Sequence, residues 1–370
     1  MNDTSQRSSV VVVGGGYGGI AVARALDDYA RVTLVEPKDA FVHNVAALRA
    51  LVEPTWLPRI FLPYDGLLVH GTVVRDRAVR VDAAQITLAS GQRLNPGFIV
   101  LATGSSYPFP AKSDEPNTVD AVDRYRAVHA NLARADRVML LGAGAVGLEL
   151  AGEIAAAWPD KHIVLVDVAE QILPGPYDQR LRDELNRQLD ALGVERVMGS
   201  ALTHLPDVPP GEARAFTATT TAGTRIEADI WFRCHGITPT TGYLGDEFAA
   251  ARTRDGYLTV TPQLQVVGFD RIYALGDIAA IDANKAGVAG RQATVVAGNI
   301  RAQLAGTGER TVYSPGPPVM ILPLGPSGGA GQLPNRDDIA TAEVISEIKG
   351  REMMVDRYAT LLNVQAADSR

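Results

Sequence analysis

The stretch VVVVGGGYGGIAVARALDDYARVTLVE, residues 10–36, decides the fold of this chain. Its first residues are four valines, which predict a buried parallel strand because they are β-branched and no polar residue alternates with them. The strand runs into Gly14, Gly16 and Gly19 in the spacing G-x-G-x-x-G, and an Ala/Leu-rich helix follows. A second apolar strand then ends at Glu36. This order predicts the first unit of a Rossmann-like, doubly wound α/β domain.

Each part of this stretch has a physical role in binding a dinucleotide. Gly14 allows the tight turn, Gly16 lets the backbone approach a pyrophosphate, and Gly19 lets the helix pack close to the strand. The helix N-terminus offers unpaired N–H groups and the positive end of its dipole to the phosphates. Glu36 follows Gly14 by 22 residues, where a carboxylate can accept both hydroxyls of an adenosine ribose. A purely structural glycine turn is the alternative, and the agreement of all five features argues against it.

A second fingerprint lies in mid-chain. The stretch RVMLLGAGAVG, residues 137–147, is an apolar strand followed by Gly142, Gly144 and Gly147 in the same spacing. After the next helix, a further strand ends at Asp167. Two complete fingerprints predict two different dinucleotides, with a decayed gene duplicate as the alternative. An acid at this position binds a ribose 2′-hydroxyl and repels a 2′-phosphate, so NADH is favoured over NADPH.

Composition sets the class of protein. The chain has 370 residues, which suggests two domains, and its 46% hydrophobic and 21% charged residues are typical of a globular protein. The net charge of −7 argues against a nucleic-acid partner. The single cysteine, Cys234, excludes an internal disulfide and a cysteine-based zinc site, and it suits a cytoplasmic protein. No apolar run reaches the roughly 18 to 20 residues of a transmembrane helix. We therefore expect neither a metal site nor a transmembrane segment.

Two shorter motifs complete the pattern. FIVLATG predicts a buried strand that ends in Thr103 and Gly104, and IYALGD predicts another that ends in Gly276 and Asp277. Glycine at the end of a strand lets the backbone approach a ligand. The carboxylate of Asp277 could bind a sugar-alcohol chain, or it could only cap the following helix.

The motif order GGGYGG, ATG, GAGAVG, CHG and GD resembles the pyridine nucleotide–disulfide reductase superfamily of two-dinucleotide-binding flavoproteins. Within it, the stretch HNVAALRA is similar to the ferroptosis suppressor and apoptosis-inducing-factor-like proteins, which are relatives of type II NADH dehydrogenases. The resemblance implies that the first fingerprint binds FAD and the second binds NAD(P)H. The residues that it assigns to FAD are Gly14, Gly16, Gly19, Glu36, Thr103, Gly104, Gly276 and Asp277. Those that it assigns to the nicotinamide nucleotide are Gly142, Gly144, Gly147, Asp167 and Gly236.

The lack of further cysteines bears on the mechanism. Disulfide reductases of this superfamily carry a C-x4-C pair beside the flavin, and the matching region here, residues 43–48, contains no cysteine. We expect Cys234, in an apolar strand, to be a buried small hydrophobe. Electrons must then leave the reduced flavin directly. The resemblance implies hydride transfer from NADH to flavin N5, followed by two-electron reduction of a quinone. An iron–sulfur protein, a specific metabolite, or slow turnover in a redox-sensing flavoprotein are the alternatives.

Four residues are candidates for tuning this chemistry. Glu149, in the second fingerprint helix, matches a family glutamate near the nicotinamide, and Lys285 matches a family lysine that could stabilise an anionic reduced flavin. His43 could relay protons, although a packed histidine is the expectation we prefer. Lys38 could reach an FAD phosphate or the adenine edge, with a solvated loop lysine as the alternative. Glu149 and Lys285 are the predicted catalytic residues.

The order of the motifs predicts the domain organisation. We expect an NAD(P)H domain inserted into an FAD domain, followed by a small α+β segment that caps the quinone side of the flavin. The expected bounds are a tail at 1–9, the FAD domain at 10–110 and 259–310, the NAD(P)H domain at 111–258, and the cap at 311–370. Peripheral membrane contact of the cap through its Met and Leu side chains is possible, with a contact inside the folded core expected instead. The sequence leaves monomer and homodimer open.

Overall fold

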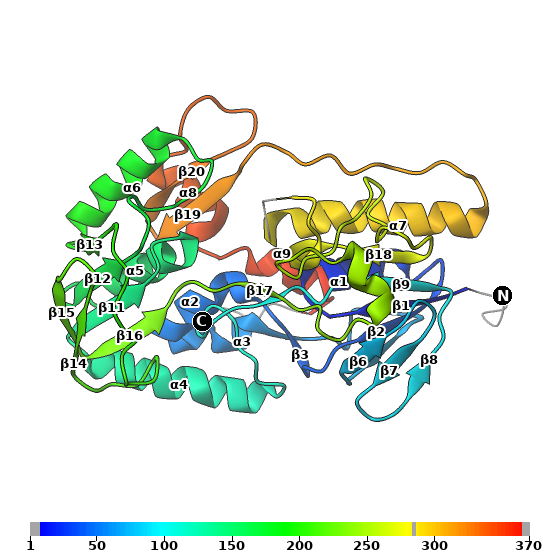
Figure 1. Cartoon of the computed structure of the whole chain (residues 1–370), viewed down its shortest axis with the longest axis horizontal. Helices are drawn as coiled ribbons and strands as arrows, with labels where there is room; N and C mark the ends of the chain where they lie inside the picture. The colour runs from blue at the N-terminus through cyan, green and yellow to red at the C-terminus, as the bar shows by residue number, and fades with distance from the viewer. Residues whose placement is uncertain (1–7, 283–285, 365–370) are drawn as a thin grey trace.

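Two parallel sheets, each beginning with one of the fingerprints, organise the computed structural model, which describes residues 8–282 and 286–364 (Figure 1). The first sheet has the strand order β18–β9–β1–β2–β5. Its strands are β1 (Ser9–Val13), β2 (Arg31–Val35), β5 (Thr72–Val74), β9 (Phe98–Leu101) and β18 (Ile272–Ala274). All neighbouring strands are parallel, and the predicted doubly wound α/β class is confirmed.

The valine run forms the centre of this sheet. Val10–Val13 lies between β2 on one side and β9 on the other, and it is buried on both faces. Helices α1 (Tyr17–Leu26) and α7 (Ala289–Ala305) pack against each other over one face of the sheet. Gly18 of α1 lies close to α7, since a Cβ built on it would meet the Ala289 Cβ at 3.8 Å. The small residues at this contact allow the two helices to pack closely.

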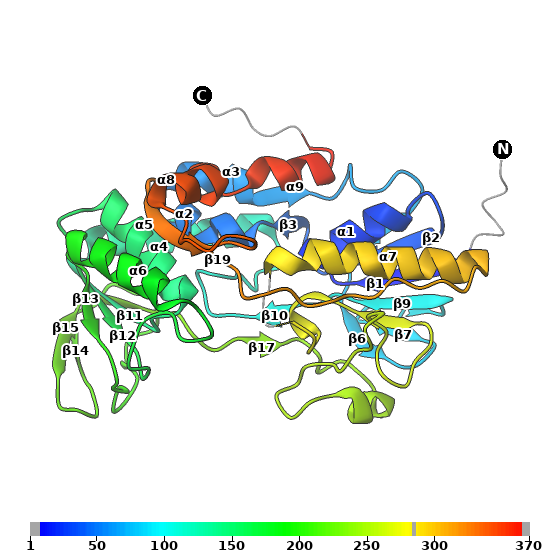
Figure 2. The same cartoon turned by 90° about the horizontal axis from the view of Figure 1, so that it is seen from above.

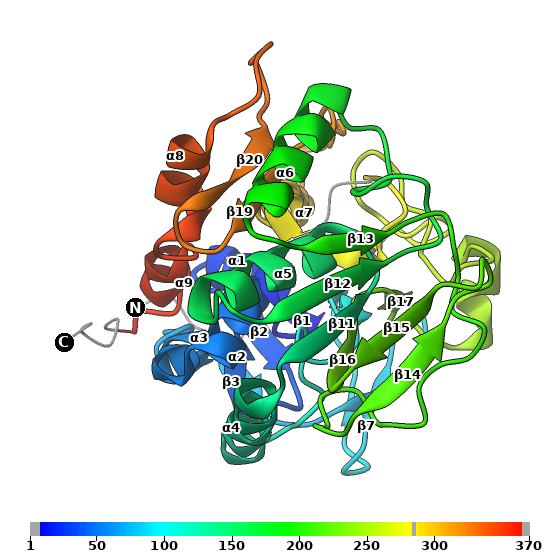
Figure 3. The same ribbon diagram turned by 90° about the vertical axis from the view of Figure 1, so that its left-hand side faces the viewer.

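The second sheet repeats this design with the order β13–β12–β11–β16. Its strands are β11 (Arg137–Leu141), β12 (His162–Val166), β13 (Glu195–Val197) and β16 (Ile230–Arg233). The hairpin of β14 (Phe216–Thr219) and β15 (Arg225–Ala228) covers one face, and α5 (Ala145–Ala157) and α6 (Gln179–Ala191) lie over the other (Figure 3). Helix α4 (Thr118–Arg134) leads into β11. Both fingerprints are therefore built as strand, glycine turn and helix.

Short elements join the two sheets and surround the first. The chain crosses between the sheets twice, through β10 (Ser105–Ser106) and β17 (Thr238–Pro239), which pair antiparallel. A small antiparallel sheet consists of β6 (Ala78–Val81), β7 (Ile86–Leu88) and β8 (Arg93–Leu94). The region after β2 contains β3 (Ala40–Val42), α2 (Ala47–Val52), α3 (Leu57–Ile60) and β4 (Phe61–Pro63). The 3-10 turns are Asn44–Ala46, Pro54–Trp56, Asp246–Ala251, Gly276–Ile278 and Ala286–Val288.

The C-terminal segment connects the two units. A hairpin of β19 (Met320–Leu324) and β20 (Gly328–Gln332) packs on α5 and α6. Helix α8 (Ala342–Ile345) and a π-helical turn (Ser346–Gly350) follow, and α9 (Val355–Leu361) reaches α1 of the first unit. Figure 2 shows α8 and α9 along one edge of the molecule, beside α2 and α3. The segment is thus an α+β element that contacts both units.

Met353 is 2% exposed and Leu362 is 0% exposed, so the core contact expected of the cap holds for these two side chains. Two predictions about local structure need correction. Ser9, placed in the tail by the sequence, begins β1. Asp277 lies in a 3-10 turn rather than in a strand, because Gly276 takes a φ of +75° and ends the extended backbone. In the part of the chain that the structure describes, no helix has the length and hydropathy needed to cross a membrane.

Candidate functional site

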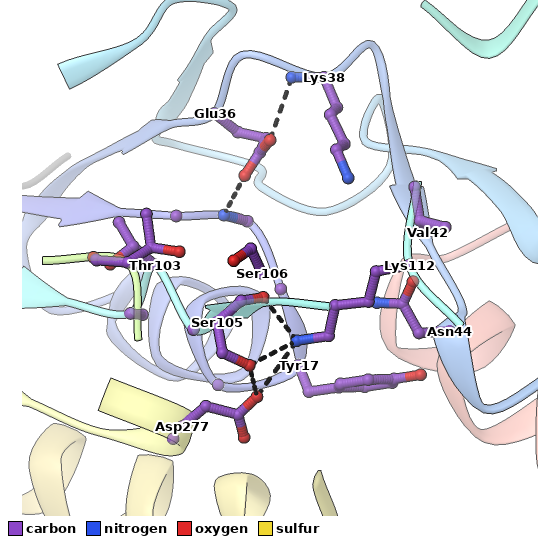
Figure 4. Close-up of a pocket in the computed structure, with 18 of the residues that line it drawn as sticks. Tyr17, Glu36, Lys38, Val42, Asn44, Thr103, Ser105, Ser106, Lys112 and Asp277 are labelled. Carbon is purple, nitrogen blue, oxygen red and sulfur yellow. Dashed lines mark hydrogen bonds and ion pairs between the residues drawn. The ribbon is translucent and has the colours of Figure 1, made fainter. Parts of the chain in front are cut away.

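A pocket of about 840 Å³ runs past the carboxyl ends of the first sheet (Figure 4). Its lining begins at Glu36 and Lys38, passes the first glycine turn, and continues to Asp277 and Asn44. Val146 and Glu149, from the start of helix α5, line it as well. One cavity therefore contains residues that follow both fingerprints. Its volume lies within the range of ordinary ligand and cofactor sites.

The three glycines of the first fingerprint have different surroundings. A Cβ built on Gly14 would lie 2.6 Å from the Ala102 carbonyl oxygen, and one on Gly19 would lie 1.8 Å from the Gly14 carbonyl oxygen. Gly14 also has a φ of +102°, which side chains rarely adopt. In contrast, a Cβ on Gly16 would meet no heavy atom of the described chain within 4 Å. Gly14 and Gly19 are thus needed for packing, whereas Gly16 leaves space open towards the pocket.

Glu36 closes the first glycine turn. Its carboxylate accepts hydrogen bonds from the Gly15 N–H at 2.6 Å and from the Lys38 N–H at 3.0 Å. The Lys38 ammonium donates to the Ser113 carbonyl oxygen at 2.6 Å, and burial lowers the pKa of this amine. Lys38 lines the pocket and is anchored, so the alternative of a solvated loop lysine does not apply.

A charged cluster lies at the other end of the pocket (Figure 4). The Ser105 hydroxyl donates to Asp277 at 2.5 Å, and Lys112 Nζ lies 3.2 Å from the same Asp277 oxygen. Lys112 also donates to the carbonyl oxygen and hydroxyl of Ser105, at 2.7 and 2.8 Å. Thr103 donates to the Thr240 carbonyl oxygen at 2.7 Å, which ties the ATG strand to the crossover. Lys112 was not predicted from the sequence, because it belongs to no motif.

His43 is fully engaged inside the protein. Its Nε2 lies 2.7 Å from the Met353 carbonyl oxygen, an acceptor, so Nε2 carries the proton. Its Nδ1 then accepts from the Tyr17 hydroxyl at 3.1 Å, and that hydroxyl accepts from the Val45 N–H at 3.0 Å. Desolvation lowers the pKa of His43 to about 4. His43 is therefore a neutral, packed histidine, as preferred from the sequence, rather than a group poised to relay protons.

The second fingerprint repeats the geometry of the first. A Cβ on Gly147 would lie 1.8 Å from the Gly142 carbonyl oxygen, whereas one on Gly144 would meet no described atom within 4 Å. Asp167 accepts the Ala143 N–H at 2.6 Å, as Glu36 accepts the Gly15 N–H. It also accepts the Ala169 N–H at 2.9 Å.

Gly236 follows the last strand of the second sheet. It has a φ of +103°, and a Cβ built on it would meet the Arg233 guanidinium at 3.3 Å. Side chains rarely adopt this positive φ, so the backbone conformation requires glycine at this position.

Glu149 is held by Lys349, a residue that was not predicted from the sequence. Lys349, from the π-helical turn, lies 2.7 Å from Glu149 Oε1, and the two side chains are 14% and 13% exposed. Burial raises the pKa of Glu149, and the positive charge of Lys349 opposes part of this shift. Four residues further along α5, Glu153 forms a buried ion pair with Arg49, whose other nitrogen donates to Glu153 at 2.9 Å. No sequence signal links Lys349 to α5, because their contact depends on the tertiary fold.

Two residues named from the sequence remain, Lys285 and Cys234. Lys285 lies outside the described residues. Cys234 is 2% exposed, and desolvation raises the pKa of its thiol to about 12, as expected of a buried small hydrophobe. Among residues 8–282 and 286–364, no group of three or more His, Cys, Asp or Glu side chains could hold a metal ion.

The residues in the pocket fit an FAD molecule. Gly16, Gly104 and Gly276 all line it, and a Cβ on any of them would meet no described atom within 4 Å, so each leaves room for a ligand. No side chain of the described residues caps the N-terminus of α1, which leaves its N–H groups available to phosphate.

Comparisons with known proteins agree with this geometry. Residues 8–298 match the family model described as pyridine nucleotide-disulphide oxidoreductase. Ferroptosis suppressor protein 1 of Taeniopygia guttata is 32% identical over 331 residues, covering 88% of each chain. Apoptosis-inducing factor homolog B of Dictyostelium discoideum is 28% identical, covering 97% of this chain and 98% of its own. The sulfide:quinone oxidoreductase of Aquifex aeolicus shares the fold, with a TM-score of 0.74, 16% identity, and coverage of 98% and 93%.

Proposed function

Because this chain belongs to the pyridine nucleotide-disulphide oxidoreductase family, we propose that it is an FAD-dependent NADH:quinone oxidoreductase. When bound, FAD would supply the redox chemistry, accepting a hydride at N5 from NADH and passing two electrons to the quinone. The protein's own contribution is to hold the two nucleotides in register, to exclude water and to place charges around the reacting rings.

The observation that carries this proposal is the shared pocket. Its lining includes Glu36, which follows the first fingerprint, and Val146 and Glu149 of helix α5. In the first fingerprint, Glu36 is placed to bind the adenosine ribose, so the flavin ring would lie at the far end. Helix α5 begins at the second glycine turn, where the nicotinamide nucleotide would bind. The two reactive rings would thus meet beside Glu149.

The site residues then have separate roles. Gly16 would admit the FAD pyrophosphate to the N-terminus of α1, and Asp277 would bind the sugar-alcohol chain next to Lys112. In the same way, Gly144 would admit the NADH pyrophosphate to the N-terminus of α5. Glu149, held in place by Lys349, would position the nicotinamide. The remaining glycines of both motifs shape the turns.

The geometry of Asp167 supports NADH over NADPH. Its carboxylate is fixed by two backbone N–H groups, at 2.6 and 2.9 Å, at the end of β12. A carboxylate fixed in this position accepts ribose hydroxyls and repels a 2′-phosphate. Glu170 lies in the same region, where one of its carboxylate oxygens is 2.9 Å from the position that a Cβ on Gly199 would take. Its carboxylate adds to the negative charge of this region.

The lack of a usable thiol supports direct electron transfer from the reduced flavin to the acceptor. The only cysteine of the sequence, Cys234, is buried and does not line the pocket. No redox disulfide can therefore form within one chain, and the reduced flavin must react with the acceptor itself. A quinone, which accepts two electrons and two protons, is the acceptor that the resemblance to ferroptosis suppressor proteins favours.

Anaerobic stopped-flow spectroscopy tests the proposal. The purified protein is mixed first with NADH and then with a short-chain quinone, and the flavin band near ~450 nm is followed. We expect bleaching with NADH and recovery with quinone within seconds. Bleaching without recovery would leave the FAD and NADH assignments intact and make the acceptor an iron–sulfur protein or another metabolite. A colourless protein that binds no added FAD would overturn the proposal.

A further inference from the structure

Lys112 places a positive charge beside Asp277 in the pocket (Figure 4). Its ammonium donates to the carbonyl oxygen and the hydroxyl of Ser105, at 2.7 and 2.8 Å, and lies 3.2 Å from the Asp277 carboxylate. These three acceptors match the three N–H groups of a lysine. The side chain is 25% exposed and lines the pocket, so a ligand can approach it. With its three donors in use, Lys112 would act on that ligand mainly through its charge.

The backbone on both sides of Lys112 is held by side chains from other elements. The Tyr125 hydroxyl of α4 donates to the carbonyl oxygen two residues before Lys112, at 2.8 Å. The Lys38 ammonium donates to the carbonyl oxygen of the residue after it, at 2.6 Å. Asp277 comes from a third place, the 3-10 turn that follows β18. Separate parts of the fold thus bring the ammonium and the carboxylate together before any cofactor binds.

The carboxylate of Asp277 is a negative charge close to where the flavin ring would lie. It is 17% exposed and accepts a hydrogen bond from the Ser105 hydroxyl at 2.5 Å. In the proposed function it binds the sugar-alcohol chain of FAD, which is attached directly to the ring. A hydride carries two electrons and one proton, so its arrival at N5 leaves one more negative charge on the ring. An unpaired carboxylate nearby would oppose that charge, because like charges repel more strongly where water is partly excluded.

Of the described residues that line the pocket, Lys38, Arg77 and Lys112 are the cations, and Lys112 is the one that pairs with Asp277. We propose that Lys112 neutralises Asp277, so that this carboxylate can hold the sugar-alcohol chain without making the flavin harder to reduce. Lys112 thereby raises the midpoint potential of the flavin. This assignment rests on the FAD site of the proposed function. It does not depend on the electron acceptor, because the potential belongs to the bound flavin itself.

A cycle of charge-removing substitutions tests the assignment. Lys112→Met removes the ammonium and keeps an unbranched side chain, Asp277→Asn removes the negative charge and keeps the shape, and the double variant removes both charges. Lys161→Met is the matched control, because Lys161 also donates to backbone carbonyl oxygens but lies outside the pocket. The midpoint potential of each FAD-loaded protein is measured by slow chemical reduction against a reference dye, without NADH or quinone. The FAD dissociation constant and the melting temperature of each apoprotein are measured as well.

We expect Lys112→Met to lower the affinity for reduced FAD, relative to oxidised FAD, about tenfold. Two charges roughly 10 Å apart interact by about that factor at an effective dielectric constant of about 20. For a two-electron couple, a tenfold change lowers the midpoint potential by about 30 mV. Asp277→Asn should raise the potential, since it leaves Lys112 unpaired, and the double variant should lie close to the wild type. Lys112→Arg keeps the charge and should restore most of the potential.

Opposite shifts in the two single variants are a result that a merely structural role of Lys112 would not produce. The assignment is overturned if Lys112→Met has the same potential as Lys161→Met, or if both single variants shift the potential in one direction. It is equally overturned if Lys112→Met weakens oxidised and reduced FAD alike, since Lys112 would then bind the pyrophosphate, whose charge is the same in both states.

A folding defect does not prevent the test. If Lys112→Met fails to fold with an unpaired Asp277, the double variant must still lie below Asp277→Asn in potential by about the same amount, and equal potentials would overturn the assignment. Failure of quinone to reoxidise the wild type would affect the proposed function alone. Loss of the expected shifts, with both half-reactions intact in the wild type, would affect this assignment alone.

Discussion

Lys349 Nζ lies 2.7 Å from Glu149 Oε1, although the two residues are 200 positions apart in the chain. The contact joins the C-terminal segment to the helix that follows the second fingerprint. One turn further along α5, the buried ion pair of Glu153 with Arg49 joins the same helix to α2. Arg49 also donates to the Gly350 carbonyl oxygen at 3.0 Å. Charged contacts from α2 and from the C-terminal segment therefore hold the first half of α5.

We expect Glu149→Gln to slow reduction of the flavin by NADH about tenfold, because a charge-assisted hydrogen bond is lost where the nicotinamide would bind. The quinone half-reaction should stay close to that of the wild type. Anaerobic stopped-flow measures the two rates separately. Glu347→Gln, which changes an exposed acid within the π-helical turn, is the matched control. Equal slowing of both half-reactions would argue against a role in positioning the nicotinamide.

Asp167→Ser should reduce the preference for NADH. The substitution removes the negative charge that repels a 2′-phosphate and the carboxylate that accepts the ribose hydroxyls. We expect KM for NADH to rise roughly tenfold, the cost of a hydrogen bond to a charged group, and KM for NADPH to stay level or fall. Steady-state kinetics with both nucleotides measures the ratio, with FAD content as the control. An unchanged ratio would show that Asp167 does not read the ribose.

Gly16→Ala and Gly144→Ala form a matched pair. Both positions have a negative φ near −75°, and a Cβ on either meets no described atom, so neither substitution should disturb the fold. Each added methyl group would instead occupy the space that a pyrophosphate needs. We expect Gly16→Ala to lose FAD with little change in apoprotein melting, and Gly144→Ala to keep FAD but bind NADH weakly.

Gly19→Ala completes this comparison, because its Cβ would lie 1.8 Å from the Gly14 carbonyl oxygen. This variant should lower the melting temperature of the apoprotein itself. If Gly16→Ala retained FAD as well as the wild type, the first fingerprint would not be the FAD site.

The His43 imidazole should make stability depend on pH. Its folded-state pKa of about 4 lies below the unfolded value of ~6.5, so the unfolded chain binds the extra proton and stability falls as the pH drops through this window. We expect His43 to account for a loss of about 2 kcal/mol between pH 7 and pH 5. Urea unfolding of the wild type and of His43→Gln at both pH values measures the difference. An equal loss in both proteins would contradict the low pKa.

Cys234→Ala should leave both half-reactions unchanged, because the thiol is buried and lies outside the pocket. Desolvation raises its pKa to about 12, so the native protein should not react with a disulfide reagent at neutral pH. Absorbance of the released thiol, before and after denaturation, provides the measurement. Loss of activity in the variant would indicate a thiol in the mechanism.

The glycine motifs allowed the fold to be predicted because their spacing reflects local constraints. Gly14 and Gly19 pack against backbone atoms of their own turn and of the adjacent strand, and Gly142 and Gly147 repeat the arrangement. Glu36 and Asp167 bond to N–H groups within the same βαβ units. Such features depend on residues close in sequence or on one neighbouring strand, which is why a pattern can reveal them.

Lys112 and Lys349 were not predicted, since each takes part in the site only through distant contacts. Lys112 reaches Asp277 across 165 positions, and Lys349 reaches Glu149 across 200. The same reason explains why the sequence could favour a packed His43 but could not identify its Nε2 partner, the Met353 carbonyl, which is 310 positions away.

The sequence by itself determined the two parallel α/β units, their two dinucleotide fingerprints and the lack of a redox disulfide, because backbone geometry and residue chemistry encode these locally. The tertiary structure alone decided that Val146 and Glu149 share a pocket with the first fingerprint, and that the C-terminal segment fastens α5 through Lys349. These relationships arise when two separately folded sheets and a terminal segment pack together. Packing of distant surfaces depends on the shapes of the finished units, and no short motif records it.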